Sequence, residues 1–178
     1  MTLVVNLFGG PGSGKSTTAA AVFSDLKRKG VEVELASEFA KDLTWEGRHQ
    51  TLTFQPYVTV KQMFRIHRLI GQVDVVVTDS PILLALAYGG QGYPVASFER
   101  FVLDQHHMWR SLNFLIRRHP NKDYHSAGRN QTADEAEALD SRIRGLLDGQ
   151  EVPYVESYGP PEGADKIVSV VRRALVQG

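Results

Sequence analysis

The fold of this chain is decided by the stretch Gly9-Gly10-Pro11-Gly12-Ser13-Gly14-Lys15-Ser16. Its spacing is G-x-x-x-x-G-K-[ST], in which glycines precede a lysine and a hydroxyl residue. The preceding residues 2–8 form a short, β-branched apolar run, which is typical of a strand buried on both faces. Residues 15–29 place apolar side chains at steps of three and four and end beside Gly30, which predicts a helix. The sequence therefore predicts a strand, a tight glycine turn and a helix in succession.

A turn of this kind binds phosphate through its backbone. Glycines let the chain curl so that successive N–H groups point inward, and the following helix contributes its positive end. Lys15 supplies a charge for the β- and γ-phosphates, Ser16 is placed to hold Mg²⁺, and Thr17 adds an α-phosphate contact. The alternative is a glycine-rich turn with an incidental lysine, but the flanking strand and helix are independent requirements and both are met. The predicted cofactors are ATP and Mg²⁺, and the predicted cofactor-binding residues in this stretch are Gly10, Pro11, Gly12, Ser13, Gly14, Lys15, Ser16 and Thr17.

Strands and helices alternate along the rest of the chain. Further strands are predicted at residues 31–36, 73–79, 112–117 and 153–156, and further helices at 55–71, 81–88, 97–110, 132–147 and 163–176. The helix at 132–147 begins with Thr-Ala-Asp-Glu, the pattern of a capping box. Strands separated by helices predict an α/β fold with a parallel sheet covered on both faces. We expect a single domain over residues 1–178.

Two carboxylates directly follow predicted strands. Because the carboxyl ends of parallel strands meet at one edge of a sheet, Asp79 can face Ser16 and share a Mg²⁺ ion with it. Asp79 could instead cap the next helix, which starts well at Ser80-Pro81, and both roles can hold. Glu38 follows the second strand, where a kinase needs a base for an acceptor hydroxyl; a solvated loop charge is the alternative.

Several polar residues are weaker candidates for the acceptor side. Asp42 lies shortly after Glu38, while Gln62 and Arg65 share one face of a predicted helix. We list Glu38, Asp42, Gln62 and Arg65 as candidate substrate-binding residues. Surface roles are equally common for the last two.

A basic segment at residues 117–131 follows the fourth predicted strand. It carries four fixed positive charges and one acidic residue. Mobile arginines can neutralise the charge of a transferring phosphoryl group and exclude water, so this segment is a candidate lid. Arg129 is the first candidate for the lid arginine, with Arg117 as a second catalytic candidate and Arg118 as a cofactor-binding one. The alternative is a solvated basic loop.

Other features carry weaker signals. Adjacent histidines on a helix point about 100° apart, so His106 and His107 are expected on the surface or at a partner rather than on a metal. Trp45, Phe54 and Tyr57 could stack on a base, although aromatic residues more often belong to the core.

Composition limits the functional classes. Lys plus Arg and Asp plus Glu both number 20, so the formal net charge is zero and any contact with nucleic acid must be local. The absence of cysteine excludes disulfide scaffolds, thiolate metal sites and cysteine nucleophiles. The first apolar run is too short for a signal peptide, and no stretch approaches a membrane span. We therefore expect a cytoplasmic protein with no membrane contact.

These motifs resemble the small P-loop kinases of the nucleoside and nucleotide kinase group, and within it the AAA-type ATP-binding proteins encoded by bacteriophages. The resemblance rests on residues 9–17, on Ser37-Glu38-Phe39-Ala40-Lys41-Asp42 with Trp45, on Thr78-Asp79-Ser80-Pro81, and on residues 124–132. It implies a three-layer P-loop NTPase sandwich with a five-stranded parallel sheet in the order 2-3-1-4-5 and a lid. It also implies Glu38 as the base. Where deoxynucleoside kinases have Glu-Arg-Ser at the third strand end, this chain has Asp79-Ser80-Pro81, which leaves the acceptor open.

The combined expectation is a kinase that uses ATP and Mg²⁺. It would transfer the γ-phosphoryl group to a hydroxyl of a nucleoside, a nucleotide or a hydroxymethyl-pyrimidine. Relatives include enzymes that act on 5-hydroxymethyluracil in phage DNA, so the partner could be a free small molecule or a modified base in DNA. In that case the location would be the host cytoplasm. The alternative is a P-loop NTPase switch that couples hydrolysis to a protein partner. The sequence leaves open the choice between ATP and GTP and the oligomeric state.

Overall fold

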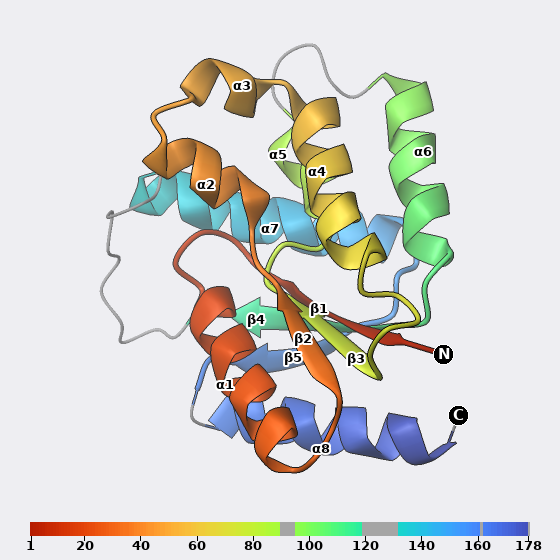
Figure 1. The fold of residues 1–178 in the computed structure, drawn as a ribbon. Coiled ribbons are helices and arrows are strands. Elements are labelled where there is room, and N and C mark those ends of the chain that lie inside the picture. The colour runs from red at the N-terminus through yellow and green to blue at the C-terminus, as the bar shows by residue number, and fades with distance from the viewer. Residues whose placement is uncertain (90–94, 119–131, 161, 178) are drawn as a thin grey trace.

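A computed structural model describes residues 1–89, 95–118, 132–160 and 162–177. Five strands form one parallel sheet in the order β2-β3-β1-β4-β5, with helices on both faces (Figure 1). The strands are β1 (Leu3–Phe8), β2 (Val33–Ala36), β3 (Val75–Thr78), β4 (Ser111–Arg117) and β5 (Val155–Tyr158). The α/β class and the strand order 2-3-1-4-5 are therefore confirmed.

The central strand β1 is buried along its whole length, which explains its continuous apolar sequence. One set of its side chains, including Val5 and Leu7, packs with α1 (Lys15–Arg28) and α8 (Glu162–Gln177). The other set, Val4 and Phe8, packs on the opposite face. That face is covered by α4 (Gln55–His67), α5 (Leu84–Tyr88), α6 (Ala96–His107) and α7 (Ala133–Gly149). The sheet is therefore the middle layer of three.

Helix ends follow the expected local chemistry. The Thr132 hydroxyl accepts the Glu135 N–H at 3.3 Å, and the Glu135 carboxylate accepts the Thr132 N–H at 2.7 Å, so the predicted capping box is present. Gly30 follows α1 with a φ of +77°, a backbone conformation that glycine adopts without strain. The start of α7 and the end of α1 are thus specified by adjacent residues.

Between β2 and α4 the structure contains two helices that the sequence pattern did not predict. They are α2 (Phe39–Trp45) and α3 (His49–Thr53). Each is too short to show a clear 3.6-residue repeat, and short helices depend on tertiary packing for their stability. Trp45 and Phe54 are 68% and 51% exposed, so the expectation that they belong to the core is wrong.

The surface position expected for His106 is also wrong. Its side chain is only 5% exposed, at the end of α6. Burial, with a smaller effect of His107, lowers the pKa of His106 from 6.5 to about 4, so the ring is neutral near pH 7.

The parallel sheet positions three segments of interest. Residues 9–16, Glu38 and Asp79 follow the carboxyl ends of β1, β2 and β3, which are neighbours in the sheet. These segments therefore gather at one edge, as expected for a ligand site of an open parallel sheet. Within the described residues, no helix is both long and apolar enough to cross a bilayer.

Candidate functional site

The P-loop, residues 9–16, is held at Gly10 from two directions. The Gly10 N–H donates to Asp140 Oδ1 at 2.6 Å, and Lys15 Nζ donates to the Gly10 carbonyl at 2.9 Å. A Cβ on Gly10 would lie 2.5 Å from Asp140 Oδ1 and 2.8 Å from the Ala136 carbonyl, so only glycine fits there. Gly14 has a φ of +100° and leads directly into α1, whose first residue is Lys15. The loop therefore packs closely against α7 at Gly10, whose N–H is occupied by Asp140, and turns at Gly14 into the N-terminus of α1, where a phosphate group can bind.

The second carboxylate lies beside this loop with an unsatisfied oxygen. Asp79 is 6% exposed, and its Oδ1 is buried without a hydrogen-bond partner, as is the Ser13 hydroxyl. A buried carboxylate oxygen without a partner is costly unless a cation or a donor completes it. Mg²⁺ favours one or two carboxylates together with phosphate oxygens, and a serine hydroxyl is the usual P-loop ligand. Asp79 and Ser16 therefore fit Mg²⁺, and the P-loop amides fit the phosphates.

Glu38 is the N-cap residue of α2 and lies close enough to Lys15 and Asp79 to interact with both charges. Burial raises the pKa of the Glu38 carboxyl, with Lys15 acting in the opposite direction and Asp79 in the same direction. A carboxylate with a raised pKa beside a phosphate site has the properties of a general base. The structure thus brings the predicted base to the P-loop.

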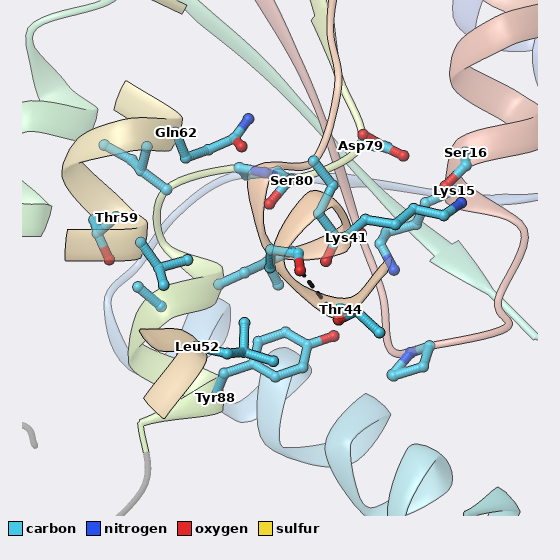
Figure 2. A pocket seen from close by; sticks show the side chains of 18 of the residues that line it. Lys15, Ser16, Lys41, Thr44, Leu52, Thr59, Gln62, Asp79, Ser80 and Tyr88 are labelled. Atoms are coloured by element: carbon cyan, nitrogen blue, oxygen red, sulfur yellow. Dashed lines mark hydrogen bonds between the residues drawn. The ribbon is translucent and has the colours of Figure 1, made fainter. Parts of the chain in front are cut away.

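A cavity of about 470 Å³ joins these groups to the helices between β2 and α5. Ligand sites have volumes of roughly this order. Figure 2 shows Lys15, Ser16 and Asp79 at one end of the cavity and Thr59, Leu52 and Tyr88 at the other. The predicted residues Pro11, Gly12, Gly14, Thr17, Glu38 and Gln62 also line it.

Gln62 is engaged by the protein itself. Its side-chain carbonyl accepts the Phe39 N–H at 2.9 Å, and its amide donates to the Thr78 hydroxyl at 3.4 Å. The side chain is 4% exposed. Gln62 therefore fixes the start of α2 against β3 at the wall of the cavity.

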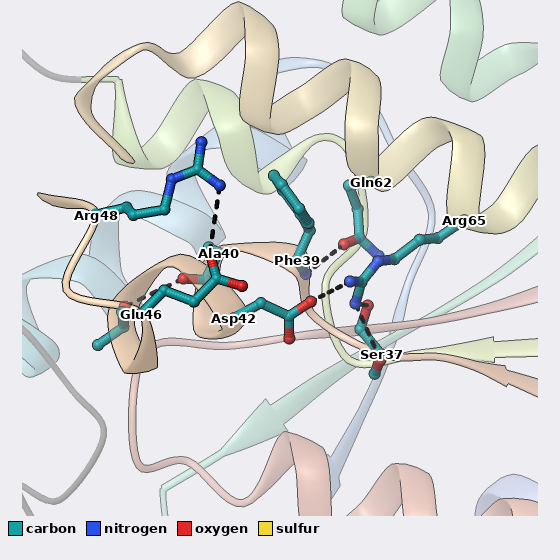
Figure 3. Close-up of polar contacts among 9 residues, drawn as sticks. Ser37, Phe39, Ala40, Asp42, Glu46, Arg48, Gln62 and Arg65 are labelled. Atoms are coloured by element: carbon teal, nitrogen blue, oxygen red, sulfur yellow. Dashed lines mark hydrogen bonds and ion pairs between the residues drawn. The ribbon is translucent and has the colours of Figure 1, made fainter. Parts of the chain in front are cut away.

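Asp42 and Arg65 lie outside this cavity. They form an ion pair with each other and line a second groove on the other side of α2 and α4 (Figure 3). Arg65 also donates to the Ser37 carbonyl and hydroxyl, both at 3.1 Å, and its guanidinium lies 5.2 Å from the centre of the Phe39 ring. The structure therefore does not bring these two candidate substrate-binding residues to the P-loop.

The candidate lid arginines have different surroundings. Arg117 is exposed, pairs with Glu156 at 3.2 Å and does not line the cavity. Arg118 pairs with Asp140 at 3.0 Å and donates to the Pro11 carbonyl at 2.9 Å, so it touches the P-loop backbone. Arg129 lies outside the described residues, as does most of the predicted lid.

Sequence reasoning missed several residues of the site. Lys41 and Tyr88 line the cavity, and Asp140 anchors the P-loop from α7. Lys41 lies three residues after Glu38, and residues three apart on a helix are neighbours. Had α2 been predicted, this spacing would have placed Lys41 beside Glu38. Asp140 lies 130 residues from Gly10, and no local pattern marks it.

The geometry agrees with the comparison with known families. The family model described as an AAA domain matches residues 4–162. The chain belongs to this AAA domain family. An AAA domain of this type implies nucleotide binding and P-loop NTPase activity, typically with ATP and Mg²⁺. The matched residues of this AAA domain include all of β1 except Leu3, and they include the P-loop, Glu38 and Asp79. No curated protein matches the chain.

Proposed function

We propose that this AAA domain is a kinase that transfers the γ-phosphoryl group of ATP to the hydroxyl of a nucleoside-like acceptor. The observation that carries the proposal is the cavity, which begins at the P-loop and continues into a compartment formed by α2–α5. An enzyme that only hydrolyses ATP needs room for one water, whereas a kinase needs a second compartment beside the γ-phosphate.

The charged end of the cavity supplies the phosphate chemistry. Lys15 and the P-loop amides would bind the triphosphate, with Ser16 and Asp79 holding Mg²⁺. Bound there, Mg²⁺ offsets negative charge on the β- and γ-phosphate oxygens. Lys15 must exchange its bond to the Gly10 carbonyl for phosphate oxygens, which lie within reach of a flexible four-carbon side chain.

Glu38 acts on the acceptor. It accepts the hydroxyl proton while the acceptor oxygen forms a bond to the γ-phosphorus. The bond from that phosphorus to the bridging β–γ oxygen breaks, and its electron pair leaves with ADP. Arg129 and Arg118 remain predicted to neutralise the transferring group, and Arg118 contacts the Pro11 carbonyl of the P-loop. Arg117 pairs with Glu156 outside the cavity and is a weaker candidate.

The test measures acceptor-dependent ADP formation with ATP, Mg²⁺ and a panel of nucleosides, nucleotides and hydroxymethyl-pyrimidine DNA. Glu38→Gln should lower the rate by about 10²–10⁴-fold, the usual contribution of a general base. Glu46→Gln is the matched control, because Glu46 ends the same helix but is exposed and outside the cavity. Lys15→Ala should remove phosphoryl transfer, and an intact Lys15→Ala variant that still transfers phosphate would refute the proposal.

An NTPase switch is the competing outcome of the same assay. It predicts ATP turnover that no acceptor stimulates and that a protein partner accelerates. Under that result Glu38→Gln would affect hydrolysis and no acceptor product would form.

A further inference from the structure

Helix α2 has one face toward the cavity and one away from it. Glu38, the N-cap residue, and Lys41 and Thr44, at successive steps of three, line the cavity together with the P-loop. Phe39 and Asp42 line the groove on the other side of the helix. Residues three apart on a helix are neighbours, whereas consecutive residues point about 100° apart. Lys41 therefore shares the cavity face of α2 with Glu38.

Contacts on the opposite face fix this orientation of α2. Asp42 forms an ion pair with Arg65, and the Phe39 N–H donates to the Gln62 side chain at 2.9 Å (Figure 3). The backbone of α2 is thus anchored to α4, while the Lys41 side chain is exposed and lines the cavity. The flexible four-carbon stem of a lysine lets its ammonium group reach a ligand there without any movement of the helix.

Lys41 belongs to the charged end of the cavity. Burial has the largest effect on the pKa of the Glu38 carboxyl and raises it, whereas the charges of Lys15 and Lys41 act to lower it. Both ammonium groups therefore lie within electrostatic range of the same carboxylate. Figure 2 shows Lys41 with Lys15 and Asp79 around one end of the cavity. His49, the first residue of α3, lines the cavity too, but the charge of a histidine depends on pH, whereas a lysine stays charged near pH 7.

The position of Glu38 indicates which phosphate Lys41 meets. Attack on the γ-phosphorus is in line, so the γ-phosphate is the end of the triphosphate that faces the acceptor. As the base, Glu38 lies where the acceptor oxygen meets that phosphorus. Lys41 follows about one turn later on the same face of α2. Its ammonium therefore lies toward the γ-phosphate rather than toward the α- or β-phosphate.

We infer that Lys41 is a further catalytic residue, whose ammonium group binds the γ-phosphoryl oxygens from the acceptor side of the cavity. Phosphoryl transfer spreads negative charge over these oxygens, and a cation already in place stabilises it. Lys41 stays protonated and forms no covalent bond, and the bonds that form and break are those described above. Its contact with the γ-phosphate rests only on ATP binding by this AAA domain, whereas its effect on transfer rests on the proposed kinase function.

The binding experiment compares two nucleotides that differ in the γ-phosphate. The full chain is titrated, in the presence of Mg²⁺, with ADP and with a non-hydrolysable ATP analogue that has nitrogen between its β- and γ-phosphates. Lys41→Met should weaken binding of the analogue by about tenfold or more and binding of ADP by less than about threefold, because ADP lacks the group that Lys41 binds. Lys41→Arg keeps the charge and should restore most of the affinity for the analogue. Lys61→Met is the matched control, because Lys61 is exposed on α4 outside the cavity, and it should leave both affinities unchanged.

The acceptor assay provides a second readout. Lys41→Met should lower kcat by about 10²–10³-fold, the usual effect of removing one group that stabilises developing charge. Lys41→Arg should retain kcat within about tenfold, because it supplies a cation at the same place. Since the Lys41 side chain is exposed, urea unfolding of Lys41→Met should match that of the unsubstituted protein, which separates these effects from a loss of folding.

The two nucleotide affinities decide the role of Lys41. An equal loss of affinity for ADP and for the analogue overturns the inference, because Lys41 would then attract polyphosphate in general. No loss for either nucleotide also overturns it, because Lys41 would then only offset the charge of Glu38. If no acceptor stimulates the reaction, the proposed kinase function fails, but the comparison of ADP with the analogue still tests the contact between Lys41 and the γ-phosphate.

Discussion

Asp140 joins α7 to the P-loop, so its removal should destabilise the fold by a measurable amount. One carboxylate oxygen accepts the Gly10 N–H at 2.6 Å, and the other accepts Arg118 Nε and Nη2 at 3.2 Å and 3.0 Å. A hydrogen bond to a charged group contributes about 1.5–3 kcal/mol. The ion pair is partly exposed, at 26% and 27% for the two side chains, so we assign it at most about 1 kcal/mol.

Asp140→Ala should therefore lower the free energy of unfolding by about 2–4 kcal/mol. Asp140→Asn keeps an oxygen for the Gly10 N–H but loses the ion pair and the charge, so it should cost about 1–2 kcal/mol. The loss of stability in Asp140→Asn measures the ion pair with Arg118, and the further loss in Asp140→Ala measures the hydrogen bond to Gly10.

Urea denaturation measures these differences. Glu137→Ala is the control, because Glu137 lies on the same helix with an exposed side chain. Added salt screens exposed ion pairs, so it should reduce the loss of stability caused by Asp140→Asn. The difference in stability between Asp140→Asn and Asp140→Ala, which reflects the hydrogen bond to Gly10, should change less with salt. If Asp140→Ala falls within about 0.5 kcal/mol of Glu137→Ala, the contact with the P-loop contributes nothing and the reasoning is refuted.

Three further predictions follow from the same structure. Gly10→Ala should raise the KM for ATP by about tenfold or more, because the new Cβ would lie 2.5 Å from Asp140 Oδ1. Gly145→Ala is the control: its Cβ would meet nothing within 4 Å, so the KM for ATP should not change. The free energy of unfolding, measured in urea, should fall by about 3 kcal/mol from pH 6.5 to pH 4. Folding lowers the pKa of His106 from 6.5 to about 4, so at these pH values the unfolded chain binds a proton that the folded protein does not bind. If His106→Gln showed the same pH dependence as the unsubstituted protein, this explanation would be contradicted. The kcat/KM of phosphoryl transfer should rise with pH, with an apparent pKa above the usual range for Glu. Burial raises the pKa of Glu38, and this residue must lose its proton before it can act as a base. A kcat/KM that does not change with pH would count against Glu38 as the base.

Much of the site was predictable because its chemistry is local. The P-loop is a contiguous run whose glycines, lysine and serine act through their own backbone and side chains. Glu38 and Asp79 each follow a strand, and a parallel sheet brings such strand ends together whatever the intervening sequence contains. The short helices α2 and α3 were missed because their patterns are too brief to separate from a loop.

The amino-acid sequence alone determined the phosphate-binding turn, the alternation of strands and helices and the two carboxylates at the sheet edge. The tertiary structure alone decided that Arg65 pairs with Asp42 away from the cavity and that Asp140 holds Gly10. It also decided that Leu52, Thr59 and Tyr88, from three different helices, line one cavity with the P-loop. A turn is governed by neighbouring residues, whereas the partner of a long side chain depends on which distant segments pack together, and no local pattern encodes that choice.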